Sequence, residues 1–460
     1  MDDFPDLTVL ERSRISPPPA TIGHRSLPLT FFDITWLLFP PVHHLFFYHF
    51  PHSKSHFMET VVPGLKHSLS ITLQHYFPFV SNLFVFPNQC DSGFIRKPEI
   101  RHVEADSVAL TFAECGLDFN DLAGNHPRKC KKFYPLVPLL GNAFKGSDYV
   151  TIPLYSVQVT YFPNSGISIG MTNHHSLGDA TTRFGFLKAW TSVSESGGNQ
   201  SLDSFSTPIY DRLIDIPKLD ENKMNHTNLE AFYQPPSLAG LPDRVRATFV
   251  LARTHIIQLK KQVLTQLPTL EHVSSFTVTC GYIWSCIAKS LVKVGERKGE
   301  DELEQFILMV DFRSRLDPPV PTTYFGNCGA PCIVTSKNIV LSGENGFVTS
   351  AKLIGEGISK MVNTNEGILK DAERWHDGFK IPARRIGVSG TPKLDFYDVD
   401  FGWGKPIKYE IVSIDYNGSV SIGVCKESGQ DLEIGVCFPG MQMDAFAEIF
   451  NDGLESAIGS

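Results

Sequence analysis

Two adjacent histidines are followed at regular intervals by an aspartate and then an arginine. Asp179 lies four positions after His175, the second histidine of the pair His174-His175, and Arg183 lies four further on. A well-placed imidazole accepts a proton from a hydroxyl near neutral pH, because its unperturbed pKa is about 6.5. The motif could therefore supply a general base at His175. A helix cap at Asp179 beside two partly buried histidines accounts for the same residues and stays open as the alternative.

A zinc site is a third interpretation of this motif, since histidines and carboxylates are common zinc ligands. Adjacent residues of an extended chain point to opposite sides, so His174 and His175 do not readily share one ion. We therefore expect no metal at the motif and no inhibition by chelators.

The elements around the motif are expected to hold it rigidly. Alternation at 155–161 and 166–172 predicts two strands around a Pro-Asn-Ser-Gly turn, and the second strand ends at the histidines. A helix is expected next, with Asp179 in its first turn, where the helix dipole favours a carboxylate. His175 is thus predicted at a strand-to-helix junction, where rigid elements hold a loop residue in place.

The length of the chain predicts two domains, because 460 residues exceed what one hydrophobic core usually serves. The stretch 192–243 carries S-E-S-G-G-N-Q-S and Q-P-P-S and few apolar repeats, and segment 196–243 makes up most of it. We interpret it as a crossover linker between an N-terminal domain, 1–195, and a C-terminal domain, 244–460. Strands and helices are mixed in both halves, which predicts an α/β or α+β class.

Local signals in the second half predict individual elements. A helix is expected around Lys260. Ser274 or Ser275 can cap the helix that follows it. The sequence D-Y-N-G at Asp415–Gly418 predicts a hairpin turn.

Charge and composition restrict the partners. The formal net charge of −8 argues against general nucleic-acid binding. The most apolar segment, 31–48, is interrupted by Asp33, Pro40 and Pro41, and so predicts buried core and not a membrane span. Nine cysteines without zinc-ligand spacing, and an opening without secretory features, predict reduced thiols. We expect a cytoplasmic monomer without nucleic-acid or membrane partners.

A second motif, D-F-G-W-G, occupies Asp400–Gly404. Two glycines around a tryptophan indicate a tight bend with close backbone approach. A β-bulge beside a core tryptophan is the plainer interpretation. The pentapeptide becomes specific when it is combined with H-H-S-L-G-D at this separation.

With these motifs the chain resembles the BAHD acyltransferases of plants, which use acyl-CoA donors. The resemblance covers nearly the whole chain and includes L-P-L-T-F-F-D-I-T-W at Leu27–Trp36 and Y-F-G-N-C at Tyr324–Cys328. That opening and S-G-T-P-K at Ser389–Lys393 are similar to the anthocyanin malonyltransferase branch. The resemblance implies two similar domains of CoA-dependent acyltransferase type. Each is expected to be a mixed sheet with flanking helices, with a channel between the two.

The resemblance also implies roles for the motif residues. His175 is the general base, and Asp179 belongs to the catalytic motif with its side chain turned away from the substrate. Asp400 is expected to pair with an arginine of a D-x-R strand, here Arg313 in D-F-R-S-R. The second motif is then architectural through Asp400, Gly402 and Trp403.

Arg183 carries the expectation about the donor. It lies one helical turn beyond Asp179 and should share that helix face. A malonyl group ends in a carboxylate, which arginine binds bidentately, and in similar malonyltransferases an arginine at this position meets the donor. A surface arginine paired with Asp179 is the alternative. CoA phosphates need local cations, and the further donor-binding candidates are Lys260, Ser274, Ser275 and Arg315.

The implied reaction is O-malonylation of the glucose 6″-hydroxyl of an anthocyanidin 3-O-glucoside, through a ternary complex without an acyl-enzyme. Malonyl-CoA is a co-substrate and no cofactor is expected. Ser389 or Thr391 is the candidate oxyanion donor. Another flavonoid or phenolic glucoside acceptor, or a hydroxycinnamoyl donor, is the alternative within the enzyme class. An inactive glycoside-binding relative is the alternative outside it.

Overall fold

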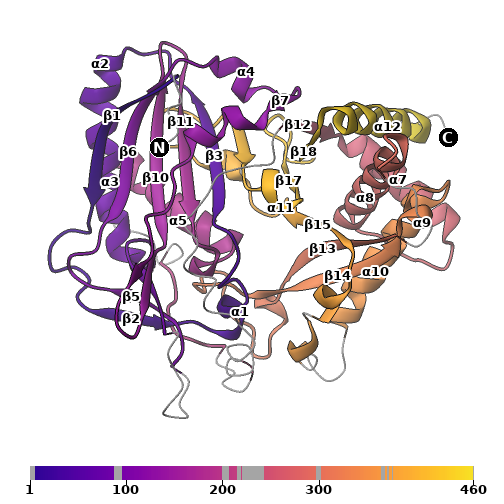
Figure 1. The fold of residues 1–460 in the computed structure, drawn as a ribbon, viewed down its shortest axis with the longest axis horizontal. Coiled ribbons are helices and arrows are strands. Elements are labelled where there is room, and N and C mark those ends of the chain that lie inside the picture. The colour runs from indigo at the N-terminus through magenta and orange to yellow at the C-terminus, as the bar shows by residue number, and fades with distance from the viewer. Residues whose placement is uncertain are drawn as a thin grey trace.

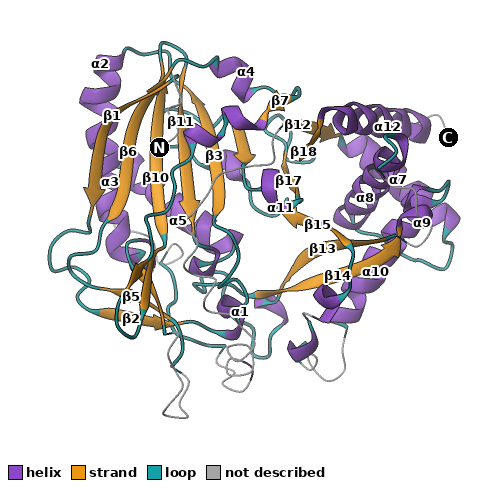
Figure 2. Cartoon of the chain, in the orientation of Figure 1, coloured by secondary structure: helices purple, strands orange, loops and turns teal. Residues whose placement is uncertain are grey.

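The protein folds into two lobes, each with mixed sheet and flanking helices (Figures 1 and 2). The predicted mixed α/β class and the two-domain organisation are confirmed. None of the helices in the described part of the chain combines the length and apolar composition that a membrane span needs. The structure, a computed structural model, describes residues 6–86, 96–198, 207–214, 219, 243–296, 302–363, 368–369, 372–375 and 377–458.

The N-terminal lobe is built on a six-stranded sheet that delivers the histidine motif. Strands β10 and β11 pair antiparallel from Tyr155–Asn173 to Phe162–Gly166, as their alternation predicts. In spatial order the strands are β1 (Leu7–Ile15), β6 (Val108–Cys115), β10 (Tyr155–Phe162), β11 (Gly166–Asn173), β3 (Val42–His49) and β16 (Lys408–Ile411).

Helices α3 and α5 pack together in the core of this lobe, where the Trp190 indole donates to Ser68 Oγ at 3.0 Å. The helices of the lobe are α1 (Phe31–Ile34), α2 (Lys54–His56), α3 (Val62–His75), α4 (Phe119–Ala123) and α5 (Ala180–Glu195), with a π-helical turn at Phe57–Val61 joining α2 to α3. A smaller sheet joins β2 (Arg25–Pro28), β5 (Glu99–His102), β4 (Asn82–Val85), β9 (Val150–Pro153) and β8 (Phe144–Lys145).

The C-terminal lobe is built around α8, whose residues are apolar on most sides and almost all buried. Its strands are β14 (Gly329–Lys337), β13 (Leu303–Asp311), β15 (Arg384–Ser389), β17 (Val420–Val424), β18 (Leu432–Pro439), β12 (Arg244–Leu251) and β7 (Arg128–Lys129). Its helices are α7 (Arg253–Gln266), α8 (Ser275–Lys293), α9 (Asn338–Ser342), α10 (Gly346–Val362), α11 (Ile414–Asn417) and α12 (Gly440–Ile458).

The lobes exchange strands. β7 comes from the first half of the chain and pairs with β12, whereas β16 comes from the second half and pairs with β3 (Figure 1). The predicted domain boundaries stay a prediction, and most of the predicted linker lies outside the described residues. Within it, Ile209 forms a β-bridge with Tyr324.

The predicted hairpin at Asp415–Gly418 is wrong. The segment forms the short helix α11, which ends at Gly418 with φ +70°. The D-Y-N-G signal marks a chain reversal correctly, but β16 pairs with the N-terminal sheet and β17 with β18 in the other lobe. The two flanking strands therefore cannot pair with each other as a hairpin.

A buried charge cluster joins the exchanged strands. Glu410 on β16 forms ion pairs with Arg128 of β7 at 2.9 Å and with Arg246 of β12 at 3.0 Å. Asp415 lies 3.3 Å from Arg246. Burial alone would raise the pKa of Glu410, but the charges of Arg246 and Arg128 outweigh it and lower the pKa to about 2. The carboxylate is thus held ionised between the lobes.

We predict that Glu410→Gln lowers the free energy of unfolding at neutral pH by on the order of 3–5 kcal/mol, because Arg128 loses its buried carboxylate partner and Arg246 keeps only Asp415. The folded-state pKa lies below the ordinary value of 4.5. The contribution of Glu410 is therefore complete above about pH 4.5 and is lost as the pH falls toward about 2. Urea unfolding at pH 7 and pH 3 measures both effects.

Glu114→Gln is the matched control, because Glu114 pairs with Lys54 at the surface. Its loss should cost less than about 1 kcal/mol. Equal destabilisation by the two variants would contradict a stabilising role for the buried cluster.

Candidate active site

The histidine motif forms a sharp turn between β11 and α5. A 3-10 turn, His175–Leu177, follows the strand, and Asp179 then caps α5 by accepting from the Thr182 amide at 3.1 Å. Gly178 has φ +154°, and a Cβ there would lie 2.6 Å from the Thr182 side chain. The predicted junction and the helix cap are both confirmed.

His175 as a whole residue is partly exposed to solvent. It lies flat against Trp36, with ring centroids 3.8 Å apart and planes 8° apart. Its Nδ1 is buried and has no hydrogen-bond partner among the described residues. Burial, and then the charge on Arg183, lowers the pKa of His175 to about 3. The imidazole is therefore neutral near pH 7 and can accept a proton.

The neighbouring His174 closes the turn, because its Nδ1 accepts from the Ser176 amide at 3.2 Å. Two clusters in the described part of the chain could hold a metal ion, around Cys437 and around Cys425. Neither cluster includes His174 or His175.

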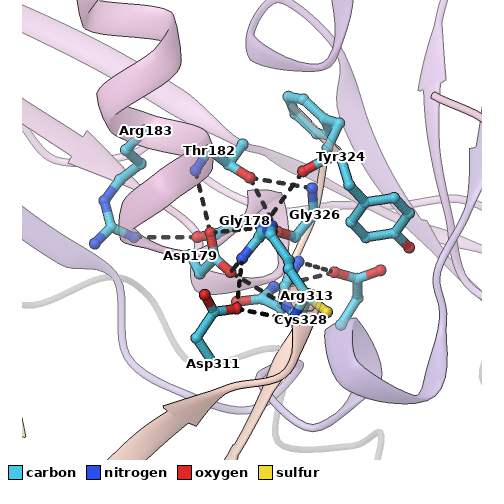
Figure 3. A network of polar contacts seen from close by, with 12 residues as sticks. Gly178, Asp179, Thr182, Arg183, Asp311, Arg313, Tyr324, Gly326 and Cys328 are labelled. Carbon is cyan, nitrogen blue, oxygen red and sulfur yellow. Dashed lines mark hydrogen bonds and ion pairs between the residues drawn. The ribbon is translucent and has the colours of Figure 1, made fainter. Parts of the chain in front are cut away.

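Asp179 binds Arg313 of the other lobe. Arg313 Nη1 lies 2.6 Å from Asp179 Oδ2 and Nη2 lies 3.1 Å from Oδ1, a bidentate pair (Figure 3). The Cys328 amide also donates to Oδ2 at 3.2 Å. Burial would raise the pKa of Asp179, but the charge and hydrogen bonds of Arg313 outweigh it and hold the pKa low. Both carboxylate oxygens are therefore occupied by structural contacts.

The Y-F-G-N-C segment strengthens this connection. The Thr182 hydroxyl donates to the Gly326 carbonyl at 2.9 Å and accepts from the Gly326 amide at 3.1 Å. Arg313 Nη2 donates to the same carbonyl at 3.0 Å (Figure 3). The first turn of α5 is thus fastened to the C-terminal lobe through backbone and side chain together.

Asn327 and Asp33 attach the opening motif to the same turn. Asn327 Nδ2 donates to the His175 carbonyl at 3.1 Å, and to Asp33 Oδ1 at 3.1 Å. The Asn327 amide donates to Asp33 Oδ1 at 2.8 Å, and Ser176 Oγ donates to the Asp33 carbonyl at 3.2 Å. Sequence analysis singled out both segments but gave these residues no role. The sequence did offer a signal for this role, because Asp33 and Asn327 are polar residues within motifs shared with the family.

The predicted pairing of Asp400 with Arg313 is wrong. Asp400 Oδ1 accepts from the amides of Gly402 at 2.8 Å and Gly404 at 3.0 Å, which closes its own turn. Both glycines have positive φ, +96° and +98°, a conformation that side chains disfavour. Trp403 packs edge-on against Tyr48. The turn belongs to the aromatic core of the N-terminal lobe, while Arg313 is occupied by Asp179.

Arg183 is half-buried, and its Nη1 donates to the Gly178 carbonyl at 3.0 Å (Figure 3). In the described part of the chain no ion pair joins it to Asp179, but the charges of the two groups favour each other; a surface arginine paired with Asp179 stays the alternative. Arg183 Nε is buried and lacks a hydrogen-bond partner among the described residues. The charge on Arg183 is close enough to lower the pKa of His175. A buried, unpaired donor beside the base suits an anionic ligand.

The structure brings some of the predicted donor-binding residues together. Lys260 of α7 and Ser275 of α8 line one groove of about 470 Å³, with Arg253 as a second cation. Ser274 is exposed and caps α8 by accepting from the Thr277 amide at 3.0 Å. Arg315 does not line this groove; it is exposed and donates to the Asp311 carbonyl at 2.6 Å. The donor role of all four residues stays a prediction.

The two oxyanion candidates lie at and beyond the end of β15. Ser389 pairs in register with Ser421, and Thr391 Oγ1 accepts from the Lys393 amide at 3.2 Å. Thr391 also lines a small cavity of about 30 Å³. No described hydrogen bond joins either side chain to the histidine turn, and their role stays a prediction.

Comparisons with known proteins show the family of the chain. The Transferase family model matches residues 6–452, and the chain belongs to this family, the BAHD acyltransferases. It is 75% identical over its whole length, and the whole length of the relative, to malonyl-coenzyme A:anthocyanin 3-O-glucoside-6''-O-malonyltransferase of Dahlia pinnata. It is 40% identical to malonyl-coenzyme:anthocyanin 5-O-glucoside-6'''-O-malonyltransferase of Salvia splendens, over 98% of this chain and 96% of that one.

The crystal structure of vinorine synthase has a similar fold, with a TM-score of 0.70 over 95% of this chain and 96% of that chain, at 18% identity. The family and the 75% identical relative show that the protein is an acyltransferase.

We predict that Asp179→Asn lowers the free energy of unfolding by on the order of 3 kcal/mol, because the buried Arg313 loses its bidentate partner and keeps only the more exposed Asp311. The rate of acyl transfer should fall with it, since the turn that carries His175 loses its attachment. Thermal unfolding and initial rates measure the two effects.

Asp311→Asn is the control, because Asp311 also contacts Arg313, at 3.3 Å, but is 46% exposed. It should change stability by less than about 1 kcal/mol and leave the rate near that of the wild type. A rate for Asp179→Asn equal to that of the wild type would contradict the structural role of the pair.

Proposed function

We propose that this protein transfers the malonyl group of malonyl-CoA to the glucose 6″-hydroxyl of an anthocyanidin 3-O-glucoside. The observation that carries the proposal is the 75% identity, over the full length of both chains, to the dahlia enzyme named for this reaction. Arg183 is half-buried, its Nε has no partner among the described residues, and its charge acts on His175, which supports a donor that ends in a carboxylate.

The proposed mechanism uses His175 as general base. The neutral imidazole takes the proton of the sugar hydroxyl while the oxygen attacks the malonyl thioester carbonyl. The tetrahedral oxyanion then collapses, the carbon–sulfur bond breaks, and the imidazolium returns its proton to the CoA thiolate. Asp179 takes no part in proton transfer, because both of its oxygens accept other hydrogen bonds. The reaction needs no cofactor beyond the co-substrate.

The setting of this reaction is also a proposal. We propose that the protein acts as a cytoplasmic monomer with malonyl-CoA and a flavonoid glucoside as its ligands. The eight described cysteines are all free, which fits a reducing compartment. The net charge of −8 supports the absence of a nucleic-acid partner.

The experiment that tests the function is thiol release from malonyl-CoA with a panel of glucosides, followed by mass spectrometry of the product. An anthocyanidin 3-O-glucoside should be malonylated at the 6″-position. His175→Ala should lower the rate by roughly 10²–10⁴-fold, because it removes the base. Equal rates for the two proteins would contradict the base assignment. Malonylation of phenolic glucosides alone would favour the alternative acceptor, and no turnover with any of them would favour an inactive relative.

We predict that Arg183→Ala raises the KM for malonyl-CoA by roughly 10- to 100-fold, because a charged hydrogen bond contributes about 1.5–3 kcal/mol. The KM for acetyl-CoA, which has no terminal carboxylate, should change little. Arg183→Lys should fall between the wild type and Arg183→Ala, since lysine keeps the charge without the bidentate geometry. Equal effects on both donors would remove Arg183 from the donor site.

A further inference from the structure

The contact between Trp36 and His175 is the closest ring contact of the candidate base. The two rings lie parallel at 3.8 Å, and Phe39 meets the same imidazole at a steep angle of 82° with centroids 5.3 Å apart. We propose that Trp36 is a positioning residue for His175, which fixes the plane of the imidazole and stabilises the imidazolium formed during transfer. The inference rests on the proposed function, in which His175 is the base.

The electrostatic surroundings of His175 explain why an aromatic face is needed. Both oxygens of Asp179 point to other donors, and no described carboxylate hydrogen-bonds to the His175 ring. Arg183 places a positive charge nearby, which opposes protonation. Asp179 favours the imidazolium only through its charge, so the imidazolium that forms when the hydroxyl proton moves lacks a hydrogen-bonded anionic partner among the described residues. The face of an indole ring attracts a cation through its quadrupole, more strongly than tyrosine or phenylalanine does.

The backbone around Trp36 is held firmly enough to keep the rings parallel. Asp33 and Thr30 form a capping box at α1, and the Trp36 amide donates to the Asp33 carbonyl at 3.1 Å. The side chain of Asp33 is bound by Asn327, which also donates to the His175 carbonyl. Asn327 thus binds His175 directly and is connected to Trp36 through Asp33. This common attachment sets the distance between their backbones, and stacking then sets the angle between their rings.

The first test compares ring substitutions at position 36. Trp36→Leu keeps an apolar, though smaller, side chain but loses the aromatic face, and kcat should fall roughly 10- to 30-fold. Trp36→Phe should lose less, while the KM values for both substrates stay within about twofold. Leu38→Ala, at a neighbouring side chain that is 44% exposed, is the control and should match the wild type. Melting temperatures of all variants show whether they remain folded.

The second test separates charge from shape. Fluorinated tryptophans weaken the negative face of the indole stepwise with little change in its size, so log kcat should fall with each added fluorine. The chain contains five tryptophans, so the same labels in Trp36→Phe measure the effect of the other four. A stepwise fall in the wild type, absent in Trp36→Phe, supports stabilisation of the imidazolium. An equal response in both proteins overturns it.

The failure of this inference is distinct from failure of the proposed function. If Trp36→Leu is as active as the wild type while His175→Ala is inactive, the role of Trp36 is wrong and the base assignment stands. If His175→Ala keeps full activity, the proposed function fails and this inference fails with it.

Discussion

The position of the histidine turn depends on the ion pair that Asp179 forms with Arg313 of the other lobe. The pair is bidentate, and Arg313 is only 3% exposed. Asp179 caps α5, the helix that follows the histidine turn, and Arg313 lies directly after strand β13 of the other lobe. A change in how the lobes dock would therefore move His175. Asp179 holds the turn in place, and in the proposed mechanism the imidazole of His175 transfers the proton.

This arrangement leaves the base with unusual surroundings. In many hydrolases a carboxylate orients the histidine and stabilises its charge, but here the acid of the motif is committed to Arg313. The ring of His175 is instead bounded by Trp36 and Phe39, and its carbonyl is held by Asn327. Burial keeps the imidazole neutral. Two of the segments that sequence analysis marked as family motifs, Leu27–Trp36 and Tyr324–Cys328, meet at this one turn from distant parts of the chain.

Sequence analysis predicted the features that depend on local signals. The strands before His175, the cap at Asp179 and the cap at Ser274 follow from alternation and from side chains that bond nearby amides. It failed where partners are distant: Arg313, 134 positions from Asp179, was assigned to Asp400 because residue types alone do not choose between two acids. The Asp415–Gly418 turn was recognised, but the destinations of its flanking strands are set by tertiary pairing.

The most direct measurement is a double-mutant cycle on the interlobe pair, with the rate of thiol release determined for Asp179→Ala, Arg313→Met and the double variant. If the pair acts as one unit that holds the histidine turn, the double variant is no slower than the less active of the two single variants. If the two losses multiply, the side chains act independently, and the pair does not position the base.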